Sequence, residues 1–337
     1  MALNPIMNVY TLTLNPKDKN SNPTYRDLFK SKFHSDCNLT DEQLFNSFFQ
    51  SFLNKIGKSN FRNDTKHKKV IGVSEYNPDN EESSLHLHST SAFIEGIIDG
   101  GQYGISRAYA DVNNKEHKQD LSVNQAVLDK FYICVCTPLN SANGFLFLQS
   151  YTESSIQESV KLFIKEVLSS DTFYDIIIQP YVPNHIIEQY KQKASIRMFS
   201  FKSKIGISDS LRVNQTIQNN SFNIEIRISP IGDNLDPTSS ETRNVISRLK
   251  DLIFDGVHIG DYQEKKVYLK DDNDKKVHYN IEDEIKKIKP TIYLKNEGIS
   301  VDEITGQPDF NQIKNFTIRL LTTVKDEYDS DEDIQEL

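Results

Sequence analysis

Two neighbouring segments constrain the fold most, because they are almost entirely apolar and yet short. Phe131–Cys136 and Gly144–Leu148 flank a polar turn around Pro138–Asn143. Neither run approaches the roughly 18 apolar residues that a membrane-spanning helix requires, so we expect no membrane crossing. Strand-length runs without alternation are typical of strands buried on both faces. The sequence therefore predicts a central antiparallel hairpin with packed structure on each side.

The segment from Thr40 to Ile56 predicts an amphipathic helix that packs on this sheet. Thr40 followed by Gln43 forms a capping-box pattern, and Gly57 is a typical stop signal. Its apolar residues recur every four positions, which gives one face of a helix. These residues are Leu44, Phe48, Phe52 and Ile56.

Other segments extend the same architecture. Residues 8–14 alternate in strand fashion, and Gly100-Gly101 between two apolar runs predicts a hairpin turn there. Helical spacing recurs in residues 152–168 and 310–325. We therefore expect an α+β protein with two domains built from mainly antiparallel sheets with packed helices. The expected limits are residues 1–170 for the N-terminal domain, 171–325 for the C-terminal domain, and 326–337 for a disordered acidic tail.

Charge is distributed unevenly along the chain. The 39 Lys and Arg residues against 48 Asp and Glu give a net charge of −9, of which the last twelve residues contribute −7. Such a tail is usually solvated, but it can also compete with phosphate for a basic surface. Two segments are strongly basic. The first contains Lys55, Lys58, Arg62, Lys66, Lys68 and Lys69, and the second contains Lys191, Lys193, Arg197, Lys202 and Lys204.

Few patterns point to catalysis or metal binding. His86 and His88 would share one strand face, yet a third ligand at a diagnostic spacing is missing, which favours an ordinary strand pair. Asp272, Glu284 and Lys286 form a weak version of the acid and lysine arrangement of metal-dependent nucleases. We therefore expect no catalytic residue, no metal site and no cofactor, with that nuclease as an alternative.

The cellular compartment is predicted from the N-terminus and the cysteines. The first residues contain neither a basic nor an apolar region of a secretory signal. The three cysteines form neither a disulfide framework nor a zinc pattern. Both observations favour the cytoplasm.

The order of elements resembles that of the RexA-like phage-exclusion proteins over about the first 200 residues. The resemblance is carried by Lys17-Asp-Lys19, Gly144–Tyr151, Ile176–Pro180 and Ile196–Lys202. It implies a cytoplasmic, two-domain α+β protein that binds DNA with little sequence preference, forms homodimers and acts with a membrane-protein partner. The acidic tail and the greater length depart from this pattern.

Together these observations favour a non-catalytic, sequence-tolerant DNA-binding protein that acts as a sensor or effector of bacterial antiphage defence (abortive infection). The lysines and arginines of both basic stretches would contact backbone phosphates. A protein-interaction scaffold without nucleic-acid binding is the other alternative, since a basic stretch can be a merely solvated surface. The sequence does not decide whether the two stretches lie close together.

Overall fold

The computed structural model divides the chain into two compact units. Unit 1 comprises residues 1–181 and 291–337, and unit 2 comprises residues 182–290. Both are built from helices and mainly antiparallel sheets, which confirms the expected α+β class. The structure describes residues 4–18, 22–33, 39–79, 82–111, 113–170, 174–206, 221–231, 235–254, 257–270, 276–281 and 288–335.

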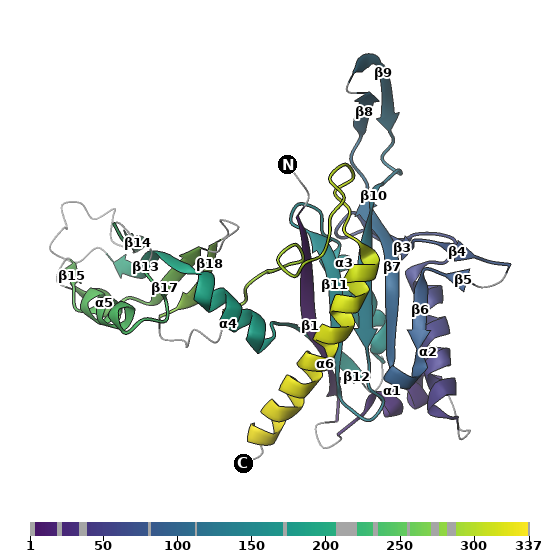
Figure 1. Ribbon diagram of the computed structural model, residues 1–337, viewed down its shortest axis with the longest axis horizontal. Helices are drawn as coiled ribbons and strands as arrows, with labels where there is room; N and C mark the ends of the chain where they lie inside the picture. The colour runs from purple at the N-terminus through teal and green to yellow at the C-terminus, as the bar shows by residue number, and fades with distance from the viewer. Residues whose placement is uncertain are drawn as a thin grey trace. The chain divides into compact units, whose positions relative to one another are not determined.

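One large antiparallel sheet forms the centre of unit 1 (Figure 1). Its strands follow the order β12-β1-β11-β10-β7-β3-β2, while β19 pairs with β1 and β6 pairs with β7. The strands are β1 (Pro5–Pro16), β2 (Arg62–Asp64), β3 (Lys69–Val73), β6 (Leu85–His88), β7 (Phe93–Gln102), β10 (Val127–Cys136), β11 (Asn143–Tyr151), β12 (Tyr174–Tyr181) and β19 (Ile292–Tyr293).

The predicted central hairpin is confirmed as β10 and β11. Residues 131–136 and 144–151 are all buried, because helices cover the sheet on both faces. The core on one face includes residues of α1 (Tyr25–Lys32), α2 (Asp41–Ile56) and α3 (Gln157–Leu168). On the other face α6 (Phe310–Gln335) crosses β10 and β7 and buries Ile313 and Val324 (Figure 1).

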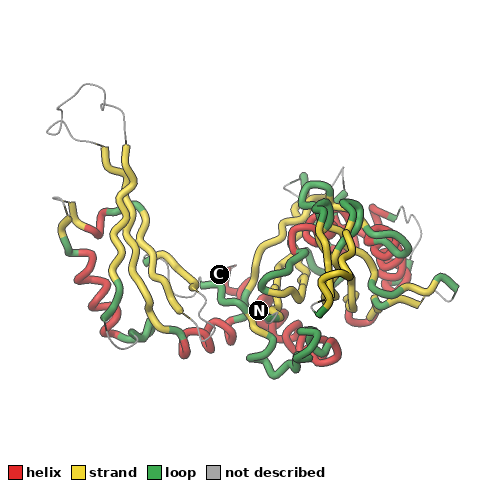
Figure 2. The backbone as a smooth tube through the Cα atoms, turned by 90° about the horizontal axis from the view of Figure 1, so that it is seen from above, coloured by secondary structure: helices red, strands yellow, loops and turns green. Residues whose placement is uncertain are grey.

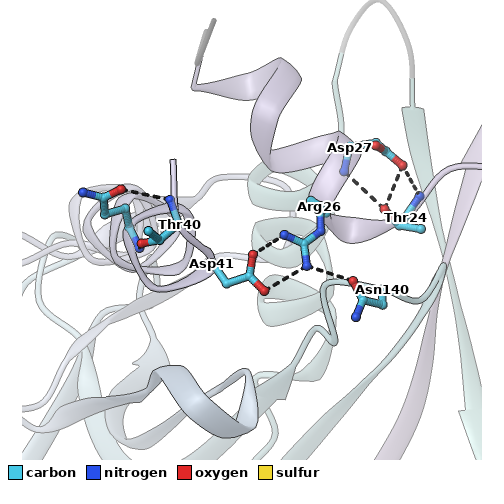
Figure 3. Close-up of polar contacts among 7 residues, drawn as sticks. Thr24, Arg26, Asp27, Thr40, Asp41 and Asn140 are labelled. Carbon is cyan, nitrogen blue, oxygen red and sulfur yellow. Dashed lines mark hydrogen bonds and ion pairs between the residues drawn. The ribbon is translucent and has the colours of Figure 1, made fainter. Parts of the chain in front are cut away.

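The predicted features of α2 are also confirmed. Thr40 and Gln43 form a capping box, and the four residues of its predicted apolar stripe are completely buried. Arg26 of α1 forms a two-point ion pair with Asp41 at the start of α2, and it donates a 2.9 Å hydrogen bond to Asn140 (Figure 3). This contact ties both helix starts to the loop between β10 and β11.

The hairpin predicted at Gly100-Gly101 is wrong, because both glycines lie inside β7. A Cβ on Gly101 would approach the carbonyl oxygen of Val127 to 1.8 Å, and one on Gly100 would approach Ile156 to 2.8 Å. Glycine is needed there for close packing, and the turn expected between two strands does not form. The exposed ribbon of β8 (Arg107–Asp111) and β9 (Asn114–Leu121) follows β7, while β4 (Tyr76–Asn77) and β5 (Glu82–Ser83) precede it (Figure 1).

The limits of the two units differ from the expected residues 170 and 325. β12 was expected to open the second domain, but it pairs along its whole length with β1. The chain also returns to unit 1 after residue 290, where β19 pairs with β1 and α6 covers the sheet. Unit 2 is thus inserted within unit 1.

The first residues of the acidic tail also belong to the folded part of unit 1. Helix α6 continues from Lys325 through residues 326–335 instead of ending before them. Tyr181 Oη donates a 2.9 Å hydrogen bond to Glu327, and the ring of Tyr328 contacts Phe145 edge-on at 5.7 Å. These contacts explain why the helix extends beyond the predicted end.

Unit 2 contains a four-stranded antiparallel sheet with the order β14-β13-β17-β18. Apolar residues of both α4 and α5 pack against one face of this sheet, and Figure 2 shows α5 alongside the long strands. Phe199, Phe201, Val267 and Leu269 are completely or almost completely buried there. The elements are α4 (Asn184–Lys193), β13 (Ser195–Gly206), β14 (Ser221–Ile228), α5 (Ser240–Lys250), β15 (Ile253–Phe254), β16 (Val257–His258), β17 (Glu264–Lys270) and β18 (Lys276–Asn280).

Among the described residues, no helix combines the length and apolar character needed to cross a membrane.

Candidate nucleic-acid interface

The first basic stretch lies in unit 1, from the end of α2 to β3. Lys55 is in the last turn of α2, Arg62 is on β2, Lys69 is on β3, and the turn between these two strands contains Lys66 and Lys68. Lys66 and Lys68 are exposed, and the other cations of the stretch are half-buried.

Several of these cations bind groups of their own chain. Arg62 forms a two-point ion pair with Glu166 of α3, with one nitrogen–oxygen distance of 3.3 Å, and this pair lowers the pKa of Glu166. The Lys69 ammonium donates to the backbone carbonyl of Ser155. Lys58 lies 3.4 Å from Gln50 Oε1 and 5.2 Å from the centre of the Tyr76 ring. Much of this positive charge therefore supports the structure of unit 1.

Asp64 organises the turn between β2 and β3. It accepts hydrogen bonds from Ser159 Oγ at 2.6 Å and from His67 Nδ1 at 2.7 Å. Burial opposes ionisation, but these bonds outweigh it and lower the pKa of Asp64 to about 2. A catalytic triad needs the serine to be bonded to the histidine. Here both groups bond to the carboxylate instead, so the cluster holds the turn against α3.

The second basic stretch lies in unit 2 and is divided between α4 and β13. Lys191 of α4 is 7% exposed and forms a 2.6 Å ion pair with Glu188 of the same helix, which neutralises its charge. Lys193 is exposed at the end of α4, and Arg197 is exposed where a β-bulge interrupts the pairing of β13 with β17. Lys202 and Lys204 lie further along β13.

Strand pairing gathers further charged residues around Lys202. Residues 199 and 201 of β13 face the core, so Ser200, Lys202 and Lys204 face the other way. The register places Lys202 opposite Glu225 of β14 and Glu264 of β17. It places Ser200 opposite Arg227 and Lys266 in the same manner.

We call this side of the sheet the basic face and define it by five cationic residues on three adjacent strands. The side chain of Arg227 is 63% exposed and that of Lys202 is 39% exposed. In the described part of unit 2, the helices that pack on the sheet do so on the opposite face. The cationic residues are Lys202, Lys204, Arg227, Lys266 and Lys270.

Two carboxylates lie among these cations. Glu225 accepts 2.8 Å hydrogen bonds from Arg227 and Ser200, and Lys202 lies 3.7 Å away. The bond from Arg227, followed by that from Ser200, lowers the pKa of Glu225 to about 2. Lys266 lies 2.9 Å from Glu264 and lowers the pKa of that carboxyl. Both acids are therefore ionised at neutral pH, and on this face, among the described residues of these three strands, five cations against two anions leave a net positive charge.

Sequence reasoning found Lys202 and Lys204 but missed the residues that accompany them. Residues 222–228 alternate apolar and polar side chains, and residues 266–270 do the same. This alternation assigns Arg227 and Lys266 to a solvent-facing side. It does not say which strands are neighbours, and only pairing brings these residues to Lys202.

The two histidines of β6 do not form a metal centre. His88 Nε2 lies 3.2 Å from Glu95 Oε1, and its ring stacks on Phe93 with a centroid distance of 4.3 Å. Lys314 of α6 occupies the same carboxylate at 2.6 Å, so a cation is already supplied by the protein. Within the described ranges, no group of three or more His, Cys, Asp or Glu side chains could hold a metal ion. Asp272, Glu284 and Lys286 lie outside the described residues.

Comparison with known proteins does not indicate a function, so the inference of function depends on the geometry of the candidate site. No protein-family model matches the sequence, and a search of curated proteins gives no significant match either.

Proposed function

We propose that this protein binds DNA with little sequence preference and that the basic face of unit 2 contacts the phosphates. The observation that supports this proposal is the strand register, which places five cations of three neighbouring strands on one side of a sheet. Exposed lysines and arginines release counterions from DNA when they neutralise phosphates, which supplies affinity without reading bases.

The geometry of a sheet suits an extended polyanion. Side chains two residues apart on a strand are separated by about 6.6–6.8 Å, and neighbouring strands are about 4.8 Å apart. Cations on this grid can reach several phosphates at once. Arg227 is held by Glu225, while Lys204 extends from an exposed position further along β13. The face therefore combines an oriented guanidinium with flexible ammonium groups.

The role in antiphage defence belongs to the same proposal and rests on the order of the elements in the sequence. A protein that binds DNA without sequence preference can detect an infecting genome because that genome increases the amount of accessible DNA in the cell. Such detection requires no catalytic group. The proposed setting is the cytoplasm, where the buried Cys134 and Cys136 remain thiols. Expression in bacteria should lower phage plating efficiency, and loss of the basic face should remove this protection.

A salt-dependent titration tests the DNA-binding proposal. The affinity of the full chain for a labelled duplex would be measured by fluorescence anisotropy at several salt concentrations, with and without magnesium. Neutralising four cations of the basic face should weaken binding and reduce the slope of log K against log salt by up to about 3.6 if each contacts one phosphate. The substitutions are Lys202→Gln, Lys204→Gln, Arg227→Gln and Lys266→Gln.

A matched control removes the same charge from elsewhere on the surface. It replaces four exposed lysines of other segments, Lys30, Lys165, Lys289 and Lys295, by glutamine. Equal losses in both variants would mean that net charge alone governs binding and would contradict an interface on this face. Absence of binding at low salt would favour the scaffold, and magnesium-dependent cleavage would favour the nuclease.

A further inference from the structure

The basic face also contains a pair of aromatic rings that the proposed phosphate contacts do not explain. Tyr268 of β17 and His278 of β18 are directly opposite each other in the strand register. Their ring centres are 5.3 Å apart, and the ring planes are inclined by 38°. His278 is exposed and Tyr268 is half-buried.

These rings lie beside the cations and on the polar side of the sheet. Tyr268 is two residues from both Lys266 and Lys270, so the three side chains share one face of β17. On the next strand its partner in the register is Met198, which is half-buried. The core of unit 2 uses the opposite face, where Val267 and Leu269 are completely buried.

We propose that Tyr268 and His278 form a stacking platform for the bases of a single-stranded nucleic acid. This inference rests on the proposed function, since the neighbouring cations would hold the backbone of the same strand. In a duplex the faces of the bases are already stacked, whereas a single strand can turn them toward a protein ring. Every base has such a face, so stacking adds affinity without sequence preference. The basic face would thus prefer a single strand to a duplex.

This chain allows a sensitive fluorescence test because it contains no tryptophan. In Tyr268→Trp the only indole lies at the platform. Its fluorescence should be quenched by oligothymidylate and oligouridylate at the concentrations at which anisotropy shows binding. Tyr109→Trp provides the matched control, because Tyr109 is an exposed residue of β8 in unit 1. Its fluorescence should stay unchanged.

Affinity measurements complete the test. In Tyr268→Ala and in His278→Ala, the ratio of oligothymidylate affinity to duplex affinity should fall about fivefold or more. Tyr268→Phe keeps the ring and should retain the ratio of the natural protein. Thermal melting of each variant shows whether unit 2 has stayed folded. Comparison of oligothymidylate with oligouridylate distinguishes DNA from RNA as the strand, since RNA alone offers a 2′-hydroxyl.

The outcomes separate this inference from the proposed function. If the alanine variants keep the ratio and the fluorescence of Tyr268→Trp is not quenched while duplex binding remains salt-dependent, the platform is refuted and phosphate binding stands. If Tyr268→Ala weakens binding of both nucleic acids equally without a change in melting, the platform is also refuted. If the natural protein binds neither nucleic acid, both proposals fail.

Discussion

Replacing Lys314 by alanine should weaken the attachment of α6 to the sheet of unit 1. Lys314 Nζ lies 2.6 Å from Oε1 of Glu95, which is 2% exposed on β7. Burial disfavours the ionised carboxyl, but hydrogen bonds from Lys314 and then from His88 keep its pKa below the usual value. After the substitution, a buried carboxylate has lost its strongest partner.

The expected loss in the free energy of unfolding depends on how deeply each member of the Lys314–Glu95 ion pair is buried. Removing one member of a fully buried ion pair costs about 3–5 kcal/mol, and a hydrogen bond to a charged group contributes about 1.5–3 kcal/mol. The Lys314 side chain is 35% exposed, so water can replace part of the interaction. We therefore expect a loss of about 2–3 kcal/mol at neutral pH. For a unit of roughly 230 residues this lowers Tm by about 4–12 °C.

Thermal unfolding followed by circular dichroism measures this loss, with Arg319→Ala on the exposed side of α6 as control. The pH dependence has a defined sign. The lowered pKa of Glu95 stabilises the natural protein above the unfolded value of about 4.3, and this contribution is lost as pH falls through the folded pKa. The deficit of Lys314→Ala should therefore shrink in acid. A melting temperature equal to that of the control, or a deficit independent of pH, would refute the reasoning.

Three further predictions concern the core, the first basic stretch and the acidic end of the chain. Phe48→Ala should lower the free energy of unfolding, measured by urea denaturation, by about 3–5 kcal/mol, because the buried ring of Phe48 stacks on that of Phe29 with a centroid distance of 4.4 Å. A loss below about 1 kcal/mol would contradict this packing. Lys66→Gln with Lys68→Gln should reduce the slope of log K against log salt by about 0.9–1.8, which corresponds to one or two lost phosphate contacts, and an unchanged slope would remove these exposed residues from the interface. Neutralising the four acids of residues 329–333 should tighten DNA binding at low salt and have little effect at high salt, as anisotropy would show; unchanged affinity would exclude competition by the tail.

Features encoded by local pattern could be predicted from the sequence. The cap and apolar stripe of α2 depend on neighbours within one or two turns, and the structure confirms both. The Gly100-Gly101 pair shows where a local rule fails. Glycine is needed at both positions because a Cβ there would clash with Val127 or Ile156, which are distant in sequence. A prediction from turn propensity could not include these contacts and was therefore wrong. The limits of the units failed for the same reason, since β1 pairs with both β12 and β19.

The sheets of the two units differ in how many of their faces are covered by helices, and the hydrophobic pattern of their strands reflects this difference. β10 and β11 are continuously apolar because helices cover both faces of the sheet of unit 1. In unit 2, β14 and β17 alternate, and the described helices cover the apolar side alone. An extended ligand that needs a sheet face can therefore be accommodated on unit 2. The first basic stretch lies on a helix end, a turn, the edge strand β2 and its neighbour β3, where Arg62 and Lys69 already bind their own chain. On the basic face, by contrast, the register gathers five cations of three neighbouring strands on the side of the sheet opposite the described helices, with two carboxylates among these cations. Its cations, rather than the longer run of lysines in the sequence, are therefore the first to be tested.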